Sequence, residues 1–248
     1  MSGHSKWHNI RIKKQKMDQI RGKLFSKLSR EISVAAREGG GDPEMNPRLR
    51  TAIERAREAG MPNENIQRAI QRGVGGGGAE VYEQVIYEGY APGGVAVLIE
   101  ALTDNRNRTA AEVRSLFTKN GGSLAEAGAV AWLFDKKGLI TVEREAVPED
   151  ELLLLILEAG AEDLRVSDDS YEIVTPPEAF EAVKGALQAK GVPVTSAELT
   201  MIPKSTTHVE GQEAVRVLKL LEALEDHDDI QRVYSNFDIP EEILQRMS

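Results

Sequence analysis

The sequence contains no cysteine. This absence excludes disulfide bonds, thiol catalysis and every cysteine-ligated zinc or iron–sulfur site, and it is typical of a protein in a reducing compartment. Long apolar runs are also missing, because a run such as residues 152–157 is far shorter than the roughly 20 residues that a membrane-spanning helix needs. The basic N-terminal stretch is not followed by the apolar segment of a signal peptide. We therefore expect a soluble, cytosolic protein with no membrane partner.

The motifs of common cofactor and metal sites are missing as well. No GxxxxGK[ST] phosphate loop and no HExxH zinc motif occurs in the sequence. The glycine-rich stretch at 73–78 follows a predicted helix and precedes a predicted strand, the reverse of a dinucleotide-binding fold, so we interpret it as a linker. His4 and His8 are four residues apart but have no suitable third ligand near them. We expect no metal, no cofactor, no catalytic residue and no small-molecule substrate.

Charge is distributed unevenly along the chain. The formal net charge is −9, yet residues 1–73 hold sixteen Lys or Arg against eight acidic residues, while residues 74–248 hold fifteen against thirty-two. Within the first thirty residues, nine basic side chains accompany a single acidic one, Asp18. Because exposed charges act over about 10 Å at physiological salt, the local excess matters more than the acidic total. It predicts a polyanionic partner for the N-terminal part of the chain.

The spacing of apolar residues predicts three helices in the first 74 residues. A first helix, which stops at the glycines 39–41, carries basic residues on one face and apolar residues on another. Asn46 caps a second helix, whose first turn contains Pro47. Asn63 is positioned to cap a third, short helix. These residues therefore form a small helical domain with a basic tail.

After the glycine-rich linker the pattern changes to runs of Val, Ile and Tyr, which are typical of strands. We expect two strands within 81–102, a helix at 106–119 and a strand near 129–134. Residues 138–202 then follow the strand–helix–strand–strand–helix–strand order of a ferredoxin-like unit. A last helix and strand, within 212–234, have no partner in that unit and would complete the sheet that began earlier.

These elements predict an α+β protein with an N-terminal three-helix domain, followed by a split α+β domain that carries an inserted ferredoxin-like (βαββαβ) domain. The expected boundaries are 1–74 for the helical basic domain, 79–135 plus 205–248 for the discontinuous α+β domain, and 136–204 for the inserted domain.

We expect the basic N-terminal residues to bind the phosphates of DNA or RNA. Lys and Arg supply charge-assisted hydrogen bonds, each contacted phosphate releases counterions, and aromatic rings can stack on bases or sugars. A membrane surface is a poorer partner because the tail before Lys23 lacks an apolar face. A solvated helix face that binds nothing is the remaining alternative. The predicted nucleic-acid-binding residues are Lys6, Trp7, His8, Arg11, Lys13, Lys14, Lys16, Arg21, Lys23, Lys27, Arg30 and Arg37.

Two other polar clusters have competing interpretations. The stretch TDNRNRT at 103–109 lies where a strand meets a helix N-terminus, a place that can bind a phosphate, which makes Arg106 and Arg108 secondary binding candidates. We favour the simpler interpretation, in which an Asp or Asn of this stretch caps the helix and the arginines pair with neighbouring acids. The acidic stretch EDHDD at 225–229 could attract a divalent ion, but we interpret it as ordinary surface.

Four stretches are long enough to indicate a family: GHSKWHNI, GDPEMNPRLRTAIERA, IYEGYAPGGVAVLIEALTDNRNRTAAEVR and GAVAWLFDKKGLI. They resemble the YebC family, which includes the mitochondrial translational activator of cytochrome oxidase, and the similarity extends from Gly3 to about Phe237. The resemblance implies a helical N-terminal domain, two α+β domains of which one is inserted in the other, and no catalysis. Bacterial members are described as DNA-binding transcriptional regulators, while the mitochondrial relative and other bacterial members act in translation, with messenger RNA or the ribosome, and the resemblance alone does not choose between the two. We expect a DNA-binding transcriptional regulator, with a translation factor as the alternative.

Overall fold

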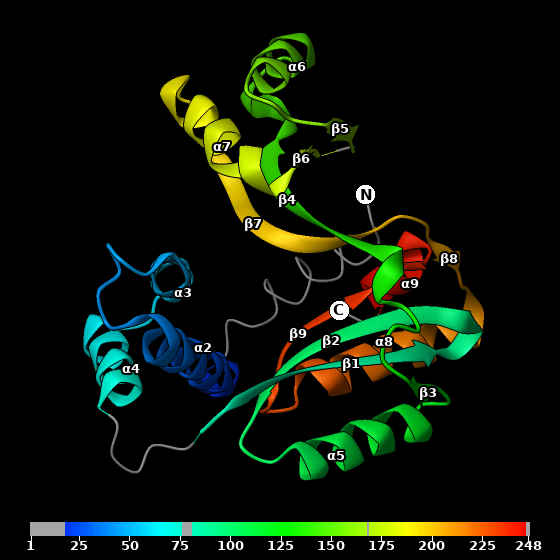
Figure 1. Cartoon of the computed structure of the whole chain (residues 1–248). Helices are drawn as coiled ribbons and strands as arrows, with labels where there is room; N and C mark the ends of the chain where they lie inside the picture. The colour runs from blue at the N-terminus through cyan, green and yellow to red at the C-terminus, as the bar shows by residue number, and fades with distance from the viewer. Residues whose placement is uncertain (1–17, 76–80, 168, 247–248) are drawn as a thin grey trace.

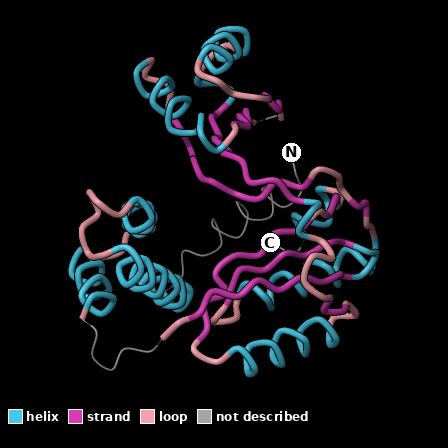
Figure 2. The backbone as a smooth tube through the Cα atoms, in the orientation of Figure 1, coloured by secondary structure: helices cyan, strands magenta, loops and turns pink. Residues whose placement is uncertain are grey.

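The computed structural model describes residues 18–75, 81–167 and 169–246, which form an α+β fold (Figures 1 and 2). Three helices come first, α2 (Asp18–Gly39), α3 (Pro47–Glu58) and α4 (Asn63–Val74). Two four-stranded antiparallel sheets with helices packed on them follow. The predicted α+β class, with three helices at the N-terminal end, is confirmed. Among the described residues, no helix is long and apolar enough to cross a membrane.

The three helices pack around a small apolar core, as their spacing predicts, and Ile32, Leu49 and Ile66 are fully buried in it. Asn46 joins the first two helices. Its side-chain oxygen accepts the backbone N–H of Leu49 at 3.1 Å, which caps α3, and its amide donates to two carbonyl oxygens at the end of α2, each at 2.8 Å. This predicted cap is confirmed, and the same side chain also connects α3 to the end of α2.

The predicted cap of the third helix is wrong. Asn63 is the first residue within α4, and the residue before the helix is Pro62, which makes no side-chain cap. The reason is that the extended backbone of Pro62, with ψ 139°, leads directly into the helix, and its carbonyl accepts the N–H groups of Asn65 and Ile66.

A close approach of α2 and α4 depends on Gly73. A Cβ atom at this position would lie 2.4 Å from the carbonyl oxygen of Ser33 and 2.8 Å from the Cβ of Ala36. Because real side chains do not tolerate such distances, only glycine lets the two helices lie this close. Nearby, the hydroxyl of Ser33 donates to the carbonyl oxygen of Ala69 at 2.8 Å, which further fixes α4 on α2.

The first sheet combines strands from the middle and the end of the chain. Its order is β3-β1-β2-β9, all antiparallel, with β9 pairing to β2 through Leu98 and Tyr234. Two helices cover one face of it, and their residues Phe117 and Leu221 are fully buried against the sheet residue Ile99 (Figure 1). The elements are β1 (Glu83–Ala91), β2 (Val95–Thr103), α5 (Arg106–Lys119), β3 (Ser123–Ala125), α8 (Gly211–Glu225) and β9 (Ile230–Ser235).

The second sheet has the order β5-β6-β4-β7, again antiparallel, so that β4 lies between β6 and β7. Ile140 and Ile173 of the sheet are fully buried together with Leu152, Ile156 and Leu187 of two helices. The elements are β4 (Phe134–Glu143), α6 (Glu149–Glu158), β5 (Asp163–Val166), β6 (Ser170–Thr175), α7 (Phe180–Ala189) and β7 (Val194–Pro203). Three further short elements are β8 (Thr207–His208), its parallel partner β10 (Phe237–Asp238), and α9 (Glu241–Arg246).

The strand expected near 129–134 is wrong. The structure has a 3₁₀ turn at Ala131–Leu133, and β4 begins at Phe134. The cause is the buried carboxylate of Glu88, which accepts the backbone N–H groups of Gly128, Val130 and Ala131 at 2.6, 2.7 and 2.8 Å. Amides that bind a carboxylate cannot at the same time pair in a sheet ladder.

Replacing Glu88 with glutamine should lower the free energy of unfolding at pH 7 by about 2 kcal/mol, because the neutral amide offers one acceptor in place of two charged oxygens. Burial alone would raise the pKa of Glu88, but the three N–H donors lower it below its ordinary value of 4.5. The carboxylate therefore stabilises the fold above about pH 4.5, and this contribution is lost as the pH falls toward the lowered pKa.

Urea unfolding of Glu88→Gln, of the wild type and of a control, Glu126→Gln, at pH 7 and pH 3.5 (about one unit below 4.5) measures this effect. Glu126 is an exposed residue two positions before Gly128. Equal stability of the two variants at pH 7 would contradict the role of Glu88, as would a deficit that stays the same in acid.

Candidate nucleic-acid interface

The predicted nucleic-acid-binding residues fall into two groups. Lys6, Trp7, His8, Arg11, Lys13, Lys14 and Lys16 lie outside the residues that the structure describes. The other five, Arg21, Lys23, Lys27, Arg30 and Arg37, belong to α2. Of these, Lys23 and Arg37 are exposed, while Lys27 and Arg30 are half-buried.

The basic face of α2 lies against the C-terminal end of α8. The ammonium group of Lys27 donates to the carbonyl oxygen of Glu225 at 2.5 Å, and that of Lys23 reaches the carbonyl oxygen of Asp226 at 3.5 Å. Carbonyl groups at the C-terminal end of a helix carry a partial negative charge, which favours cations there. The basic face predicted from the sequence is thus partly occupied by the chain's own backbone, and Arg37 lies beyond this contact.

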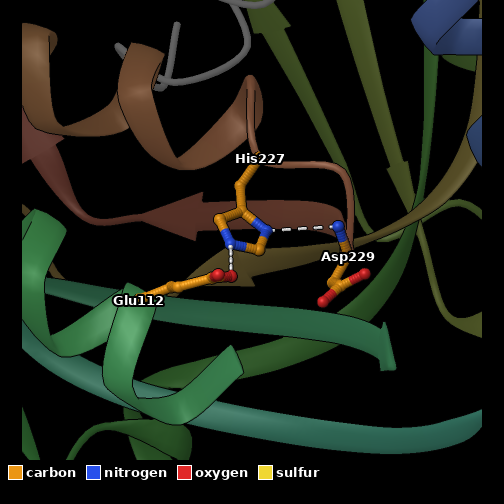
Figure 3. Close-up of side chains that lie close together, drawn as sticks. All are labelled: Glu112, His227 and Asp229. Carbon is orange, nitrogen blue, oxygen red and sulfur yellow. Dashed lines mark hydrogen bonds and ion pairs between the residues drawn. The ribbon is translucent and has the colours of Figure 1, made fainter. Parts of the chain in front are cut away.

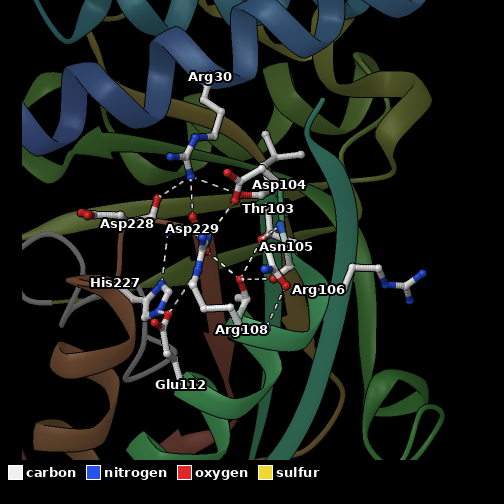
Figure 4. Close-up of polar contacts among 12 residues, drawn as sticks. Arg30, Thr103, Asp104, Asn105, Arg106, Arg108, Glu112, His227, Asp228 and Asp229 are labelled. Atoms are coloured by element: carbon white, nitrogen blue, oxygen red, sulfur yellow. Dashed lines mark hydrogen bonds and ion pairs between the residues drawn. The ribbon is translucent and has the colours of Figure 1, made fainter. Parts of the chain in front are cut away.

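Arg30 and Arg108 converge on one buried carboxylate, that of Asp229 (Figure 4). Arg30 donates to Asp229 Oδ1 at 2.9 Å and to the carbonyl oxygens of Leu102 and Asp228 at 3.1 and 3.0 Å. Arg108 donates to Asp229 Oδ2 at 2.7 Å, and the hydroxyl of Thr109 donates to the same oxygen at 2.6 Å. This cluster ties α2 to the first sheet and to the N-terminal turn of α5.

The pKa of Asp229 follows from these contacts. Burial alone would raise it, but the hydrogen bonds from Thr109, Arg108 and Arg30 lower it below the ordinary value of 3.8. Asp229 is therefore an ionised carboxylate at neutral pH, neutralised by two guanidinium groups. The interpretation of residues 225–229 as ordinary surface is wrong for Asp229, which is only 4% exposed, because the turn into β9 places it beneath α2 and α5.

The TDNRNRT stretch contains the cap and the ion pairs that its simpler interpretation predicts. The side chain of Asn105 accepts the backbone N–H of Arg108 at 3.1 Å and so caps α5. Arg108 also pairs with Asp104 at 2.9 Å, and the exposed Arg106 lies 3.8 Å from the carboxylate of Glu83. Both secondary binding candidates therefore have acidic partners within the protein.

Glu112, His227 and Asp229 have ligand atoms close enough to hold a metal ion, but their hydrogen bonds do not fit one (Figure 3). The backbone N–H of Asp229 donates to His227 Nδ1 at 3.1 Å, so the imidazole proton is on Nε2, which donates to Glu112 at 2.8 Å. Both ring nitrogens are thus in use, and the carboxylate of Asp229 already faces two arginines. A divalent cation would have to displace these donors and accept their repulsion.

A second ion-pair cluster, which was not predicted from the sequence, holds α2 in place. The half-buried carboxylate of Glu31 pairs with Arg55 of α3 at 3.0 Å and with Arg232 of β9 at 3.3 Å. Burial raises the pKa of Glu31, and the charge of Arg232 opposes this effect. The only local sign of this cluster in the sequence is that Glu31 is an acidic residue adjacent to the buried Ile32. The pairing with Arg232 could not be predicted, because Arg232 is 201 residues away in the sequence.

Comparison with known proteins identifies relatives over the whole chain. The family model described as the TACO1/YebC protein N-terminal domain matches residues 5–76, and that described as the TACO1/YebC second and third domain matches residues 82–237. A probable transcriptional regulatory protein of Dictyoglomus thermophilum is 59% identical over 249 residues, with 100% of both chains covered. One of Carboxydothermus hydrogenoformans is 60% identical over 242 residues, which cover 96% of this chain and 99% of the relative.

The fold is similar to that of a solved protein. The crystal structure of a conserved hypothetical protein, Aq1575, from Aquifex aeolicus superposes with a TM-score of 0.80 at 55% sequence identity. The match covers 92% of this chain and 94% of the other.

Proposed function

The chain belongs to the TACO1/YebC family, a family of non-enzymatic probable transcriptional regulators, and from this premise we propose that it regulates transcription by binding DNA through the basic side chains of residues 6–37. The observation that carries the proposal is the charge asymmetry: sixteen basic and eight acidic residues in the first 73, against a strongly acidic remainder. A polyanion is attracted to the first part and repelled by the second, so the charge also orients the protein on it.

The contacts of α2 divide the proposed phosphate-binding residues by role. Lys23 and Arg37 are exposed, and together with Arg21 and the basic residues of 6–16 they are the proposed phosphate contacts. Lys27 and Arg30 bond to the 225–229 segment and hold α2 against it; Lys23 is exposed at the edge of the same contact, and Arg37 is exposed outside it. Because phosphate contacts carry no sequence information, binding through these side chains alone is weakly specific.

We propose that the fold is organised as three domains, residues 1–74, residues 79–135 plus 205–248, and an inserted domain of residues 136–204. The order β5-β6-β4-β7, with α6 and α7 contributing to the core of that sheet, supports a ferredoxin-like inserted domain. The pairing of β9 with β2 supports a split second domain, since the chain returns to its first sheet after the second is complete.

The alternative, a translation factor that acts on ribosomal or messenger RNA, uses the same phosphate chemistry and is separated by sedimentation. A cell lysate treated with DNase is layered on a sucrose gradient, and the protein is followed through the ribosomal fractions; promoter DNA binding is measured on the purified chain. Absence from the ribosomal fractions together with DNA binding is the expected result. Co-migration with ribosomes, without DNA binding, would overturn the transcriptional proposal and favour translation.

A further inference from the structure

A pocket with a volume of about 630 Å³ lies between α2, α4 and Tyr82. Four arginines line it, Arg30, Arg37, Arg68 and Arg72, and none of its described lining residues is acidic. The pocket therefore has a concentrated positive charge in a protein whose net charge is negative. Its volume is in the range of sites that hold small ligands, about 300–1,000 Å³.

Two of the four arginines are neutralised within the protein. Arg30 pairs with the buried Asp229, and Arg68 pairs with Glu64 on the surface of α4. Among the residues that the structure describes, Arg37 and Arg72 have no acidic partner. These two guanidinium groups come from neighbouring helices and line the same pocket, an arrangement that suits an anion.

The pocket is held in shape by packing that does not involve a ligand. The guanidinium group of Arg72 donates to the hydroxyl of Ser29 at 2.7 Å, which fixes it against α2. The adjacent residue, Gly73, allows the close contact of α4 with α2 at Ser33. An anion would thus meet donors that are already in position, which lowers the entropic cost of binding.

The remaining lining indicates what kind of anion fits. The N–H donors of a planar arginine guanidinium group match the positions of the oxygen atoms of a phosphate group. Beside them lie two aromatic rings, those of Phe25 and Tyr82, and the guanidinium group of Arg30 lies 4.4 Å from the centre of the Tyr82 ring. Phosphate-binding arginines next to aromatic rings are the combination that binds unpaired nucleotides, whose bases are free to leave the stack.

We propose that this pocket holds one unpaired nucleotide of a single-stranded nucleic acid, with its phosphate on Arg37 and Arg72 and its base beside Tyr82. The inference rests on the proposed function and adds to it a preference for single strands over duplexes. A base pair inside a duplex cannot enter the pocket. The phosphates of single strands and of duplexes can both reach the basic residues that precede the pocket in the sequence.

The test compares the full chain with two variants in fluorescence anisotropy, using a labelled oligo(U) 12-mer and a duplex of the same length. Arg72→Gln removes the pocket guanidinium, and Arg57→Gln removes an exposed arginine of α3 that does not line the pocket. We expect Arg72→Gln to weaken oligo(U) binding by about tenfold and duplex binding by about twofold or less. Arg57→Gln should change both by about twofold or less.

If Arg72→Gln lost equal affinity for oligo(U) and for the duplex, or if the two variants lost equal affinity, the assignment of a nucleotide to the pocket would be overturned. Phosphate binding by the protein would remain in place. Failure of the wild type to bind either probe would overturn the proposed function and the pocket together. Uridine monophosphate is added as a competitor: displacement of oligo(U) at the concentrations at which oligo(U) itself binds would show a site for free nucleotides and contradict the assignment to a strand.

A crosslinking measurement on the wild type makes the result independent of the folding of any variant. Oligo(U) containing 4-thiouridine is irradiated with the full chain, and the crosslinked peptides are sequenced by mass spectrometry. Crosslinks at Tyr82 or Phe25 are expected. Crosslinks confined to residues that do not line the pocket would contradict the proposal.

Discussion

Replacing Lys13, Lys14, Arg21 and Lys23 together with glutamate should abolish nucleic-acid binding by the full chain. The four reversals change the charge of residues 1–73 from +8 to zero and remove several phosphate contacts at once. At about 0.1 M salt we expect the affinity for DNA or RNA to fall by about a thousandfold or more, because each lost contact also forfeits its counterion release. Filter binding or anisotropy on the purified variant measures the loss.

A second variant with the same total change of charge is the control. Lys119, Lys190, Arg216 and Lys219 are exposed residues outside the N-terminal part, and their replacement with glutamate also changes the charge by eight units. Binding by this variant should remain close to that of the wild type, and far-ultraviolet circular dichroism should show that both variants fold. A comparable loss in the two variants would mean that total charge, and not the basic N-terminal residues, determines binding.

The largest loss of stability is expected for Asp229→Ala, about 3 kcal/mol at pH 7. The substitution removes the acceptor shared by Arg30, Arg108 and Thr109 and leaves the arginines without their buried counter-charge. Because Arg30 belongs to α2, the same substitution weakens the attachment of the helical region to the first sheet. Urea unfolding, followed by circular dichroism, gives the change in free energy.

Asp228→Ala is the matched control, because Asp228 is exposed and its contact with Arg30 is made by its backbone carbonyl, which alanine retains. The deficit of Asp229→Ala relative to this control should also shrink in acid. The folded-state pKa of Asp229 lies below 3.8, so its stabilising contribution is present above about pH 3.8 and is lost as the pH falls toward the lowered value. Equal stability of the two variants at pH 7 would show that the cluster stabilises nothing.

Local sequence patterns predicted much of the fold. The helix expected at 106–119 has the same bounds in the structure, and the cap at Asn46 follows from its position before a proline and an apolar repeat. The antiparallel pair β1 and β2 agrees with the two strands expected within 81–102, with β2 ending one residue later, at Thr103. These features depend on residues that are neighbours in sequence, which is why pattern analysis finds them.

Features that depend on distant residues were missed. The 3₁₀ turn at Ala131–Leu133 exists because Glu88, more than forty residues earlier, binds its amides. The basic face of α2 was predicted, but its contact with the end of α8 joins residues about 200 positions apart. The pocket lined by Arg37 and Arg72 likewise requires two helices to meet at Gly73, so no local pattern singles out Arg72.

The central claim is that basic side chains of residues 6–37 bind the phosphate backbone. The salt dependence of binding tests this claim most directly. The dissociation constant of the full chain for duplex DNA is measured from about 50 to 200 mM salt, together with the same series on single-stranded RNA. If about six phosphates of the duplex are contacted, the slope of log K against log salt concentration is near −5. A slope near zero, or no binding to either nucleic acid in the most dilute buffer, would contradict the account.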